Sequence, residues 1–484
     1  MKIYAIFDDT GRKSEVIADI IGDKGFADVV VKKKKLEEYY RTNIESAYRN
    51  VEWKRIHSVF EYTDLVKLLE LSRDSDAKVI HCFSNYIFSD KAKALLTLEK
   101  LQFIDDSYRV MDGKRVAAVM FPSIDEYIKF CKVIISGQKA WDVAKNIKDS
   151  MDITGVVDIG VIGNFIQCIT GNFDSRYFNS LKGNEYTLVK SSANKMKIKA
   201  EYSFYHLLPE DMKIWFVMPF NYQESEKSAS YTMERLHMTD LAIKWVHGSM
   251  DESEFEDLMD KYFYFFTSRH FKECSTEEYE KISNNLYIKK VTDRIAELKK
   301  LSEYAKIEKL LEVSGNININ TLVERYFALK EKIEARNNYP HISVIGHGDP
   351  CFANTMYNKS TKTLKFIDPK GALTKDELWT NAYYDVAKLS HSVCGRYDFF
   401  NNALFDIKID ESFGYELEIP FDNLKYIQIF KQKVEENGFD YLTVRIYEVS
   451  LFLSMLPLHI DNPHKVFGFI LNVDKILKEI EKDV

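Results

Sequence analysis

The sequence is poor in the residues that break or cross-link a chain. Its 484 residues include only 19 Gly and 9 Pro, so we expect no long flexible linker. Its six Cys lie far apart and form no CxxC pair, which excludes the usual zinc and redox motifs. No apolar run reaches the roughly 18 residues that a membrane span needs, and the first residues lack the apolar core of a signal peptide. These absences predict a cytoplasmic protein with free thiols.

A strongly basic composition is missing too. Lys and Arg number 67 against 74 Asp and Glu, which gives a formal net charge of −7. Nucleic-acid binding needs a dense basic face, so we predict no nucleic-acid partner. Hydrophobic residues make up 45% and charged residues 29% of the chain, ordinary values for a globular protein. The length predicts about two to four domains, and nothing in the sequence indicates the oligomeric state.

The first part of the chain alternates between strand and helix patterns. KIYAIF, DVVVK, AKVIHCF and AAVMF are typical of strands, and RKSEVIADIIG and SDKAKALLTLEKL are typical of helices. Such alternation favours an α/β domain with a partly parallel sheet. We therefore predict a small Rossmann-like α/β domain over residues 1–130, of unknown role, followed by a helical connector over residues 131–151.

The pattern changes after residue 151. DIGVIGNFIQCIT and RYFNSLKGNEYTLVKSS are interpreted as strands, with turns at Gly171-Asn172 and Gly183-Asn184. NKMKIKAEYSFYHLLP predicts one helix that ends at Pro209, and KIWFVMPF and SYTMERL predict two further strands. Residues 152–240 are therefore expected to form a small antiparallel sheet with one helix, and residues 241–484 a mainly helical lobe.

Residues 343–368 depart from the mainly helical pattern of this region. There HGDPCFAN is followed by FID. Two short strands are predicted there, with KSTK as the turn between them. Phosphoryl transfer needs a base for the acceptor hydroxyl, oxygen ligands for Mg²⁺ and a cation on the phosphates. Asp349 is the candidate base. The hairpin would bring Asp368 beside Asn354, and a carboxylate with an amide oxygen suits Mg²⁺.

The cation is predicted to come from the small sheet upstream. Lys190 ends the strand YTLVKSS, and Glu201 follows eleven residues later on the predicted helix. A strand lysine paired with a helical glutamate fixes the ammonium for phosphate contact. The segment ITGNFDSRYF, which contains only Gly171, would lie over the phosphates.

Taken together, these segments resemble a known family. HGDPCFAN, FIDPKG and the helix YYDVAKLSHS follow one another as in the aminoglycoside phosphotransferase and choline-kinase-like group, relatives of protein kinases. The resemblance covers about residues 150–484 and implies a bilobal phosphotransferase fold. It implies Asp349 as catalytic base, Asn354 and Asp368 as Mg²⁺ ligands, Lys190 and Glu201 as the nucleotide pair, and a hinge for adenine near Met233 to Arg235.

The expected function is therefore an ATP- and Mg²⁺-dependent kinase that phosphorylates a small-molecule hydroxyl. The acceptor is expected to be a sugar or amino-alcohol used in capsule or surface-polysaccharide synthesis. Pro350 and Cys351 stand where the family usually has Leu and a polar residue, so the acceptor stays open. One alternative is a nucleotide-binding module without catalysis. Another is an aminoglycoside-modifying kinase, which a cleft lined with acidic residues would favour.

Each candidate residue also has a plainer interpretation. Asp349 alone could cap a turn, Lys190 could be one solvated lysine among many, and Glu201 could belong to an ordinary surface helix. His347 is expected to hold the loop by hydrogen bonds rather than to act in catalysis. Asp385, on the helix YYDVAKLSHS, is expected to brace the loop from behind.

Overall fold

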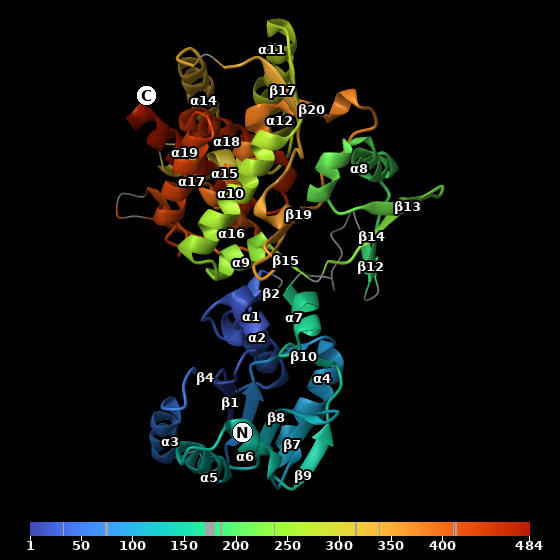
Figure 1. Ribbon diagram of the computed structural model, residues 1–484. Helices are drawn as coiled ribbons and strands as arrows, with labels where there is room; N and C mark the ends of the chain where they lie inside the picture. Colours follow the sequence, from blue (N-terminus) through green and yellow to red (C-terminus); the bar gives the residue numbers. More distant parts are fainter. Residues whose placement is uncertain are drawn as a thin grey trace. The chain divides into compact units, whose positions relative to one another are not determined.

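The chain divides into two compact units in the computed structural model (Figure 1), Met1–Asp174 and Ser175–Val484. The structure describes residues 1–31, 33–72, 76–169, 180–183, 186–236, 238–314, 317–337, 339–409, 411 and 414–484. Each unit is built around its own cluster of buried hydrophobic side chains. Within the described ranges, no helix is long and apolar enough to cross a membrane.

The first unit centres on a mixed six-stranded sheet in the order β4-β1-β5-β8-β7-β9. Strands β4, β1 and β5 are parallel, β8 is antiparallel to β5 and to β7, and β9 is parallel to β7. Every residue of the central strand β1 is buried, as expected for a parallel strand covered on both faces. The strands of the unit are β1 (Ile3–Asp8), β2 (Val30–Val31), β3 (Lys34–Lys35), β4 (Val51–Ile56), β5 (Lys78–Phe83), β6 (Tyr86–Phe88), β7 (Tyr108–Asp112), β8 (Arg115–Phe121), β9 (Asp149–Asp152) and β10 (Val156–Asp158).

Residues 131–151, expected to connect two domains, belong to this first unit. They supply the end of α5, the whole of α6 and most of β9, which pairs with β7 in the sheet. The helices of the unit are α1 (Glu15–Ile21), α2 (Leu36–Ala47), α3 (Glu61–Leu71), α4 (Lys91–Leu98), α5 (Ile124–Ile135), α6 (Ala140–Lys145) and α7 (Ile162–Ile169). The partly parallel sheet is confirmed, and its antiparallel half distinguishes it from an all-parallel arrangement.

The prediction of a strand over DIGVIGNFIQCIT is wrong, because Ile162–Ile169 form helix α7. Its apolar residues Ile162, Phe165, Ile166 and Ile169 follow the spacing of a helical face, which outweighs their β-branched character. The predicted turns at Gly171-Asn172 and Gly183-Asn184, and most of ITGNFDSRYF, lie outside the described residues.

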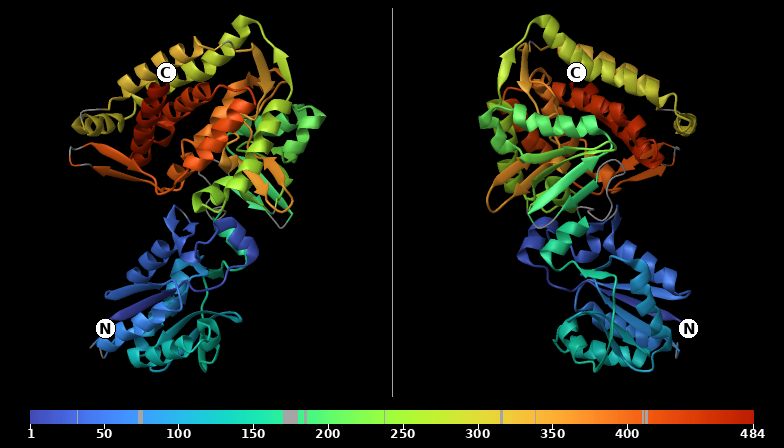
Figure 2. Two further views of the ribbon diagram at one scale, coloured as in Figure 1. Left: turned by 60° about the vertical axis from the view of Figure 1, so that its left-hand side comes forward. Right: turned by 90° about the vertical axis from the view of Figure 1, so that its right-hand side faces the viewer.

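The second unit contains the predicted small antiparallel sheet, in the order β11-β12-β14-β13. Helix α8 (Lys195–Leu207) packs on it, as the sequence predicts (Figure 2). Its buried face carries Ile198, Glu201 and Phe204. The predicted strand KIWFVMPF is wrong in its first half, where Glu210–Trp215 form a 3₁₀ turn. The sheet strands are β11 (Ser180–Gly183), β12 (Thr187–Ser192), β13 (Pro219–Glu224) and β14 (Ala229–Glu234).

The rest of the second unit is mainly helical, as expected (Figure 2). Helix α18 lies at its centre, where twelve consecutive residues, 443–454, are buried. Helices α14, α15 and α19 pack against it. The helices are α9 (Leu241–His247), α10 (Glu252–Ser268), α11 (Thr276–Asn284), α12 (Lys290–Leu298), α13 (Tyr304–Ser314), α14 (Ile319–Glu334), α15 (Ala382–Val393), α16 (Tyr397–Asn401), α17 (Leu424–Glu436), α18 (Tyr441–Met455) and α19 (Pro463–Asp483).

Short strands interrupt the helices, and those between residues 343 and 368 lie where the sequence predicts them, whereas β15, β16, β20, β21 and β22 were not predicted. Strands β18 and β19 pair antiparallel, and KSTK at residues 359–362 is the turn between them. Strand β17 precedes the HGDPCFAN segment and pairs with both β16 and β20. These strands are β15 (Thr239–Asp240), β16 (Phe271–Glu273), β17 (Ile342–Ile345), β18 (Thr355–Asn358), β19 (Thr363–Phe366), β20 (Trp379–Asn381), β21 (Asp406–Ile409) and β22 (Tyr415–Glu418).

Candidate active site

The β18–β19 hairpin brings Asn354 and Asp368 together. Thr355 pairs with Phe366, and the backbone N–H of Ile367 donates to the carbonyl of Asn354 at 2.9 Å. Asp368 follows at once and has a φ of +57°, a conformation that non-glycine residues rarely adopt and that is enriched at functional sites. The hairpin therefore fixes Asp368 beside the end of the HGDPCFAN loop.

Lys190 lies between two carboxylates. Its Nζ is 2.8 Å from Glu201 Oε2 and 2.7 Å from Asp368 Oδ1. Burial lowers the pKa of Lys190, but the Asp368 and Glu201 carboxylates more than offset this and hold the pKa above its ordinary value. The ammonium is thus charged, buried and aligned with Asp368.

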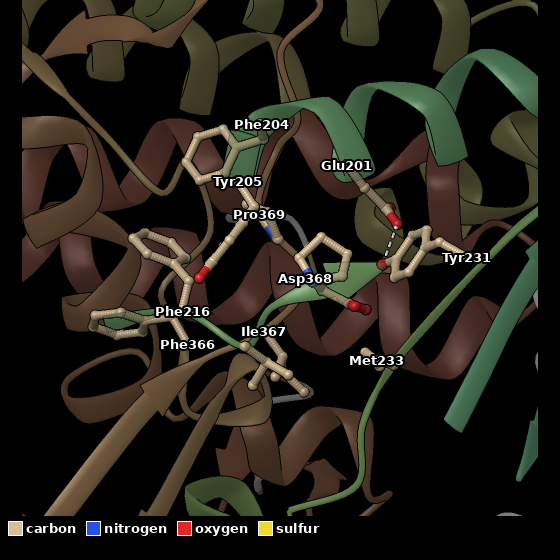
Figure 3. Close-up of a pocket in the computed structure, with 12 residues that line it drawn as sticks. Glu201, Phe204, Tyr205, Phe216, Tyr231, Met233, Phe366, Ile367, Asp368 and Pro369 are labelled. Carbon is tan, nitrogen blue, oxygen red and sulfur yellow. Dashed lines mark hydrogen bonds between the residues drawn. The ribbon is translucent and has the colours of Figure 1, made fainter. Parts of the chain in front are cut away.

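Glu201 is held from a third element. The Tyr231 hydroxyl of β14 donates to Glu201 Oε2 at 3.1 Å (Figure 3), and Tyr231 is the cross-strand partner of Lys190. The backbone N–H of Ala372 also donates to the Ala200 carbonyl at 3.0 Å, so the segment after Asp368 touches α8. Gly371 makes this approach possible, because a Cβ there would lie 2.9 Å from the Ala200 backbone.

The loop before Asp349 is organised by His347. Its Nδ1 accepts from the backbone N–H of Asp349 at 3.0 Å, so its Nε2 carries the proton and donates to the Ile367 carbonyl at 2.9 Å. Burial lowers the pKa of His347, in keeping with a neutral ring. Gly348 has a φ of +84°, and a Cβ there would lie 2.5 Å from the Lys370 side chain. His347 therefore forms the loop-holding hydrogen bonds expected of it.

Asp385 supports the same loop from α15. Its carboxylate accepts from the backbone N–H groups of His347 at 2.9 Å and Gly348 at 2.8 Å. Arg269 Nη1 donates to it at 2.6 Å, and both side chains are completely buried. Arg269 also donates to the Ala382 carbonyl at 2.7 Å. Asp385 thus braces the loop in the way the sequence predicts, with Arg269 as a partner that the sequence did not reveal.

Asp349 points to a partly open side of the loop, and its side chain is 40% exposed. Its Oδ1 is 3.0 Å from Lys388 Nζ, and the Asn354 amide donates to its backbone carbonyl at 3.0 Å. Burial raises the pKa of Asp349, but the Lys388 ammonium outweighs it, so the pKa lies below its ordinary value. The carboxylate is ionised at neutral pH and can accept a proton.

Lys388 and Tyr231 are members of the site that the sequence reasoning missed. Lys388 stands three residues after Asp385 on the same helix, and this spacing places the two side chains on one face. Tyr231 could have been found from the strand pairing with Lys190, but only once the register was known. Cys351, which departs from the family pattern, is buried, and burial raises the pKa of its thiol well above the ordinary value, which argues against a role as a nucleophile.

A small cavity lies next to the Lys190 cluster. It is lined by Glu201, Asp368 and Met233 together with aromatic side chains (Figure 3). Met233 lies on β14, as the predicted hinge requires. Arg235 is absent from the lining, and its backbone N–H already donates to the Tyr186 carbonyl at 2.9 Å. The structure thus places Met233, but not Arg235, at the cavity.

The residues predicted to hold Mg²⁺ fit that ion. Asp368 offers a half-exposed carboxylate, and the amide nitrogen of Asn354 is engaged by the Asp349 carbonyl, which leaves its oxygen as the ligand atom. Within the described ranges, no group of three or more His, Cys, Asp and Glu side chains could hold a metal. Mg²⁺ usually takes one or two carboxylates and completes its shell with water and phosphate oxygens, and Asp368 and Asn354 supply oxygen ligands of that kind.

No protein-family model and no curated protein matches the sequence. Among solved structures, aminoglycoside phosphotransferase APH(4)-Ia matches at 11% identity and a TM-score of 0.36, covering 66% of this chain and 97% of that chain. The streptomycin–ATP–APH(2″)-IIa ternary complex matches at 14% identity and a TM-score of 0.34, covering 63% of this chain and 89% of that chain. Since TM-scores below 0.5 do not establish a shared fold, these likenesses carry no weight for the function.

Proposed function

We propose that the chain is an ATP- and Mg²⁺-dependent phosphotransferase that phosphorylates a hydroxyl group of a small molecule. The observation that carries this proposal is the position of Lys190, bound to Glu201 and Asp368 within 2.8 Å. A buried lysine that faces a potential metal ligand is the arrangement that phosphate groups and their counter-ion require. The fixed loop that presents Asp349 and Asn354 adjoins it through the hairpin.

Each residue would have a distinct role in the reaction. Lys190 binds the phosphates of ATP, and Glu201 keeps the ammonium in place. Asn354 and Asp368 would hold Mg²⁺, which when bound neutralises charge on the phosphates. The acceptor oxygen bonds to the γ-phosphorus, the bond from that phosphorus to the bridging oxygen breaks, and ADP leaves. Asp349 takes the hydroxyl proton, and His347 and Asp385 keep the loop in position.

The proposed acceptor is a sugar or an amino-alcohol of the kind used in capsule or surface-polysaccharide synthesis. It would lie between the Asp349 loop and α15. The alternative of a non-catalytic nucleotide-binding module fits less well, because the base, the two metal ligands and the lysine are all present and joined by contacts. An aminoglycoside acceptor also fits less well, because the nearest charged group to Asp349 is the ammonium of Lys388.

Asp349→Asn tests the assignment. We expect ADP release, measured with Mg²⁺-ATP and a panel of sugars, amino-alcohols and aminoglycosides, to fall by about 10²- to 10⁴-fold, because the amide cannot accept the proton. Binding of a non-hydrolysable ATP analogue, measured by calorimetry, should stay within about twofold of the original. Asp406→Asn, an exposed aspartate on β21, is the control. Full turnover by Asp349→Asn would overturn the proposal.

A further inference from the structure

The surroundings of Asp349 on the acceptor side are cationic. Lys388 of α15 lies 3.0 Å from its carboxylate, although the lysine side chain is only 13% exposed. Lys290, at the start of α12, donates to the Tyr384 hydroxyl at 2.8 Å and lies over the Tyr384 ring. Burial raises the pKa of Tyr384, but Lys388 and Lys290 together bring it below its ordinary value. Two ammonium groups from two helices therefore converge on the space beside Asp349.

A third lysine, Lys465 of α19, lies near His391 of α15, but His391 itself is neutral. His391, one turn after Lys388, is buried, and burial, Lys388 and Lys465 hold its pKa well below the ordinary value. Lys465 of α19 lies over the Tyr397 ring, 5.7 Å from its centre. The nearby carboxyl of Asp398 is fully buried, and burial raises its pKa to about 7. It therefore adds less than a full negative charge near neutral pH.

This arrangement discriminates among acceptors by charge. In the resting site Lys388 pairs with one oxygen, Oδ1, of the carboxylate that must accept the hydroxyl proton, and this ion pair makes Asp349 a weaker base. A cationic acceptor would add a third positive group to the same space. A neutral acceptor would leave Lys388 on Asp349. An anionic group on the acceptor would give Lys388 a second partner and leave the Asp349 oxygen to the hydroxyl.

We infer that the acceptor carries a carboxylate or phosphate group that Lys388 and Lys290 bind, while its hydroxyl lies against Asp349. The inference rests on the proposed phosphotransferase function and names the class of its acceptor: a hydroxylated anion such as a sugar acid or a sugar phosphate. The transfer itself is unchanged, with the proton passing to Asp349 and ADP leaving.

The first test compares acceptors that share a carbon skeleton and differ at one substituent, which is neutral, anionic or cationic. One set is glucose, glucuronate, glucose 6-phosphate and glucosamine, and a second is glycerol, glycerate, glycerol 3-phosphate and serinol. With Mg²⁺-ATP, we expect the anionic members of at least one set to release ADP at least tenfold faster than the neutral member. The carboxylate and phosphate members distinguish the two sources of charge. Faster release with a neutral or cationic member would overturn the inference.

Binding gives a second readout if no member turns over. Thermal unfolding is then followed with the same compounds in the presence of Mg²⁺ and a non-hydrolysable ATP analogue. Stabilisation by glucuronate, glycerate or either phosphate ester, and not by their neutral and cationic counterparts, supports the inference. No stabilisation by any of the four anions overturns it.

Variants of Lys388 separate acceptor binding from nucleotide binding. With the anionic acceptor found above, Lys388→Met should raise the acceptor KM at least tenfold and leave the ATP KM unchanged. Lys388→Arg should restore most of the affinity. Lys289→Met, in an exposed side chain that pairs with Asp293, is the matched control. If the ATP KM rises instead, and to the same extent with every acceptor, Lys388 binds the nucleotide and the inference fails.

Loss of activity in Asp349→Asn combined with preference for a neutral acceptor would retain the proposed function and reject the acceptor class.

Discussion

Lys190 shows how much one buried charge depends on its partners. Its side chain is 3% exposed, as is that of Glu201, and the two are joined at 2.8 Å. An unpaired charge at such a depth is costly, so each member of the pair stabilises the fold only while the other is present. Asp368 is 42% exposed and stays solvated without the lysine. The stability that each of these side chains contributes therefore depends most on the partner within the Lys190–Glu201 pair.

Lys190→Met should destabilise the protein by about 3–5 kcal/mol at pH 8. The carboxyl of Glu201 would then be buried with only the exposed Lys197 ammonium, 3.8 Å from its Oε1, as an ionic partner, which favours its neutral acid form in the folded state. The folded variant binds this proton more readily than the unfolded chain. Its loss in free energy of unfolding, relative to the original protein, should therefore shrink as the pH is lowered toward 5. Urea unfolding at both pH values measures the effect.

The double variant Lys190→Met with Glu201→Gln is the diagnostic control. It removes both charges and should recover much of the lost stability, whereas Lys129→Met, in an exposed side chain of α5, should change little. If Lys190→Met loses the same stability at pH 8 and at pH 5, the buried ion pair between Lys190 and Glu201 is contradicted.

The motif residues were predictable because each sits at a fixed offset within one short segment. Asn354 and Asp368 flank one hairpin whose turn, KSTK, is evident in the sequence, and Asp349 lies five residues before Asn354. Lys388 and Arg269 were not predictable in the same way, because their contacts join segments more than 38 residues apart in the chain. Such pairs are decided by packing between elements, which no local pattern encodes.

The elements around the loop are joined by one buried ion pair. Arg269 follows the end of α10, and Asp385 lies in the first turn of α15. Through Asp385 the pair also holds the two backbone N–H groups that precede Asp349. The position of the loop therefore depends on two helices that are far apart in the chain.

Arg269→Met and Asp385→Asn should each destabilise the protein by about 3–5 kcal/mol, since each leaves the other group buried without its partner. The double variant should lose less than the sum of the two, because it leaves no unpaired charge. Denaturant unfolding measures the free energy of unfolding of the two single variants and of the double variant. The exposed pair Lys425–Glu252 is the comparison, and its single variants should lose no more than about 1 kcal/mol. If the stability losses of the two single variants simply add up in the double variant, the Arg269 and Asp385 side chains are not energetically coupled.

Helix α8 and helix α7 show where element prediction succeeds and fails. Asn194 caps α8 and Pro209 follows its end, so both boundaries are marked by residues with a strong local effect. Segment 162–169 has no such marks and is rich in Ile, so its β-branched residues favour the mistaken strand prediction, although its apolar spacing is that of the observed helix. Its place in the first unit depends on packing with α1 and β10, which the sequence alone does not reveal.

At the scale of the whole molecule, the described residues form two large clusters of buried hydrophobic side chains, one in each unit. One cluster of buried side chains runs from Ile3 to Val156 and the other from Phe204 to Ile480, with no member in common. The candidate active site lies entirely within the second unit. Proteins with more than one domain commonly depart from a single all-or-none transition, so we expect the two units to unfold as separate events.

Calorimetry should resolve two unfolding transitions. Mg²⁺ with a non-hydrolysable ATP analogue should raise the midpoint of only one of them, because a ligand stabilises the unit that binds it. In Lys190→Met that shift should be reduced, while the other transition stays in place. A single transition that moves as a whole would show that the two units unfold together.

The contact between Lys190 and Asp368 has a consequence for the order of events. In the resting protein the lysine neutralises the carboxylate that a divalent cation would need. A cation arriving alone must compete with an ammonium already in place, whereas phosphate oxygens would draw that ammonium toward themselves. By thermodynamic reciprocity, each ligand then strengthens the other. Under the proposed function, the protein should therefore bind Mg²⁺ alone more weakly than it binds the complex of Mg²⁺ with the triphosphate.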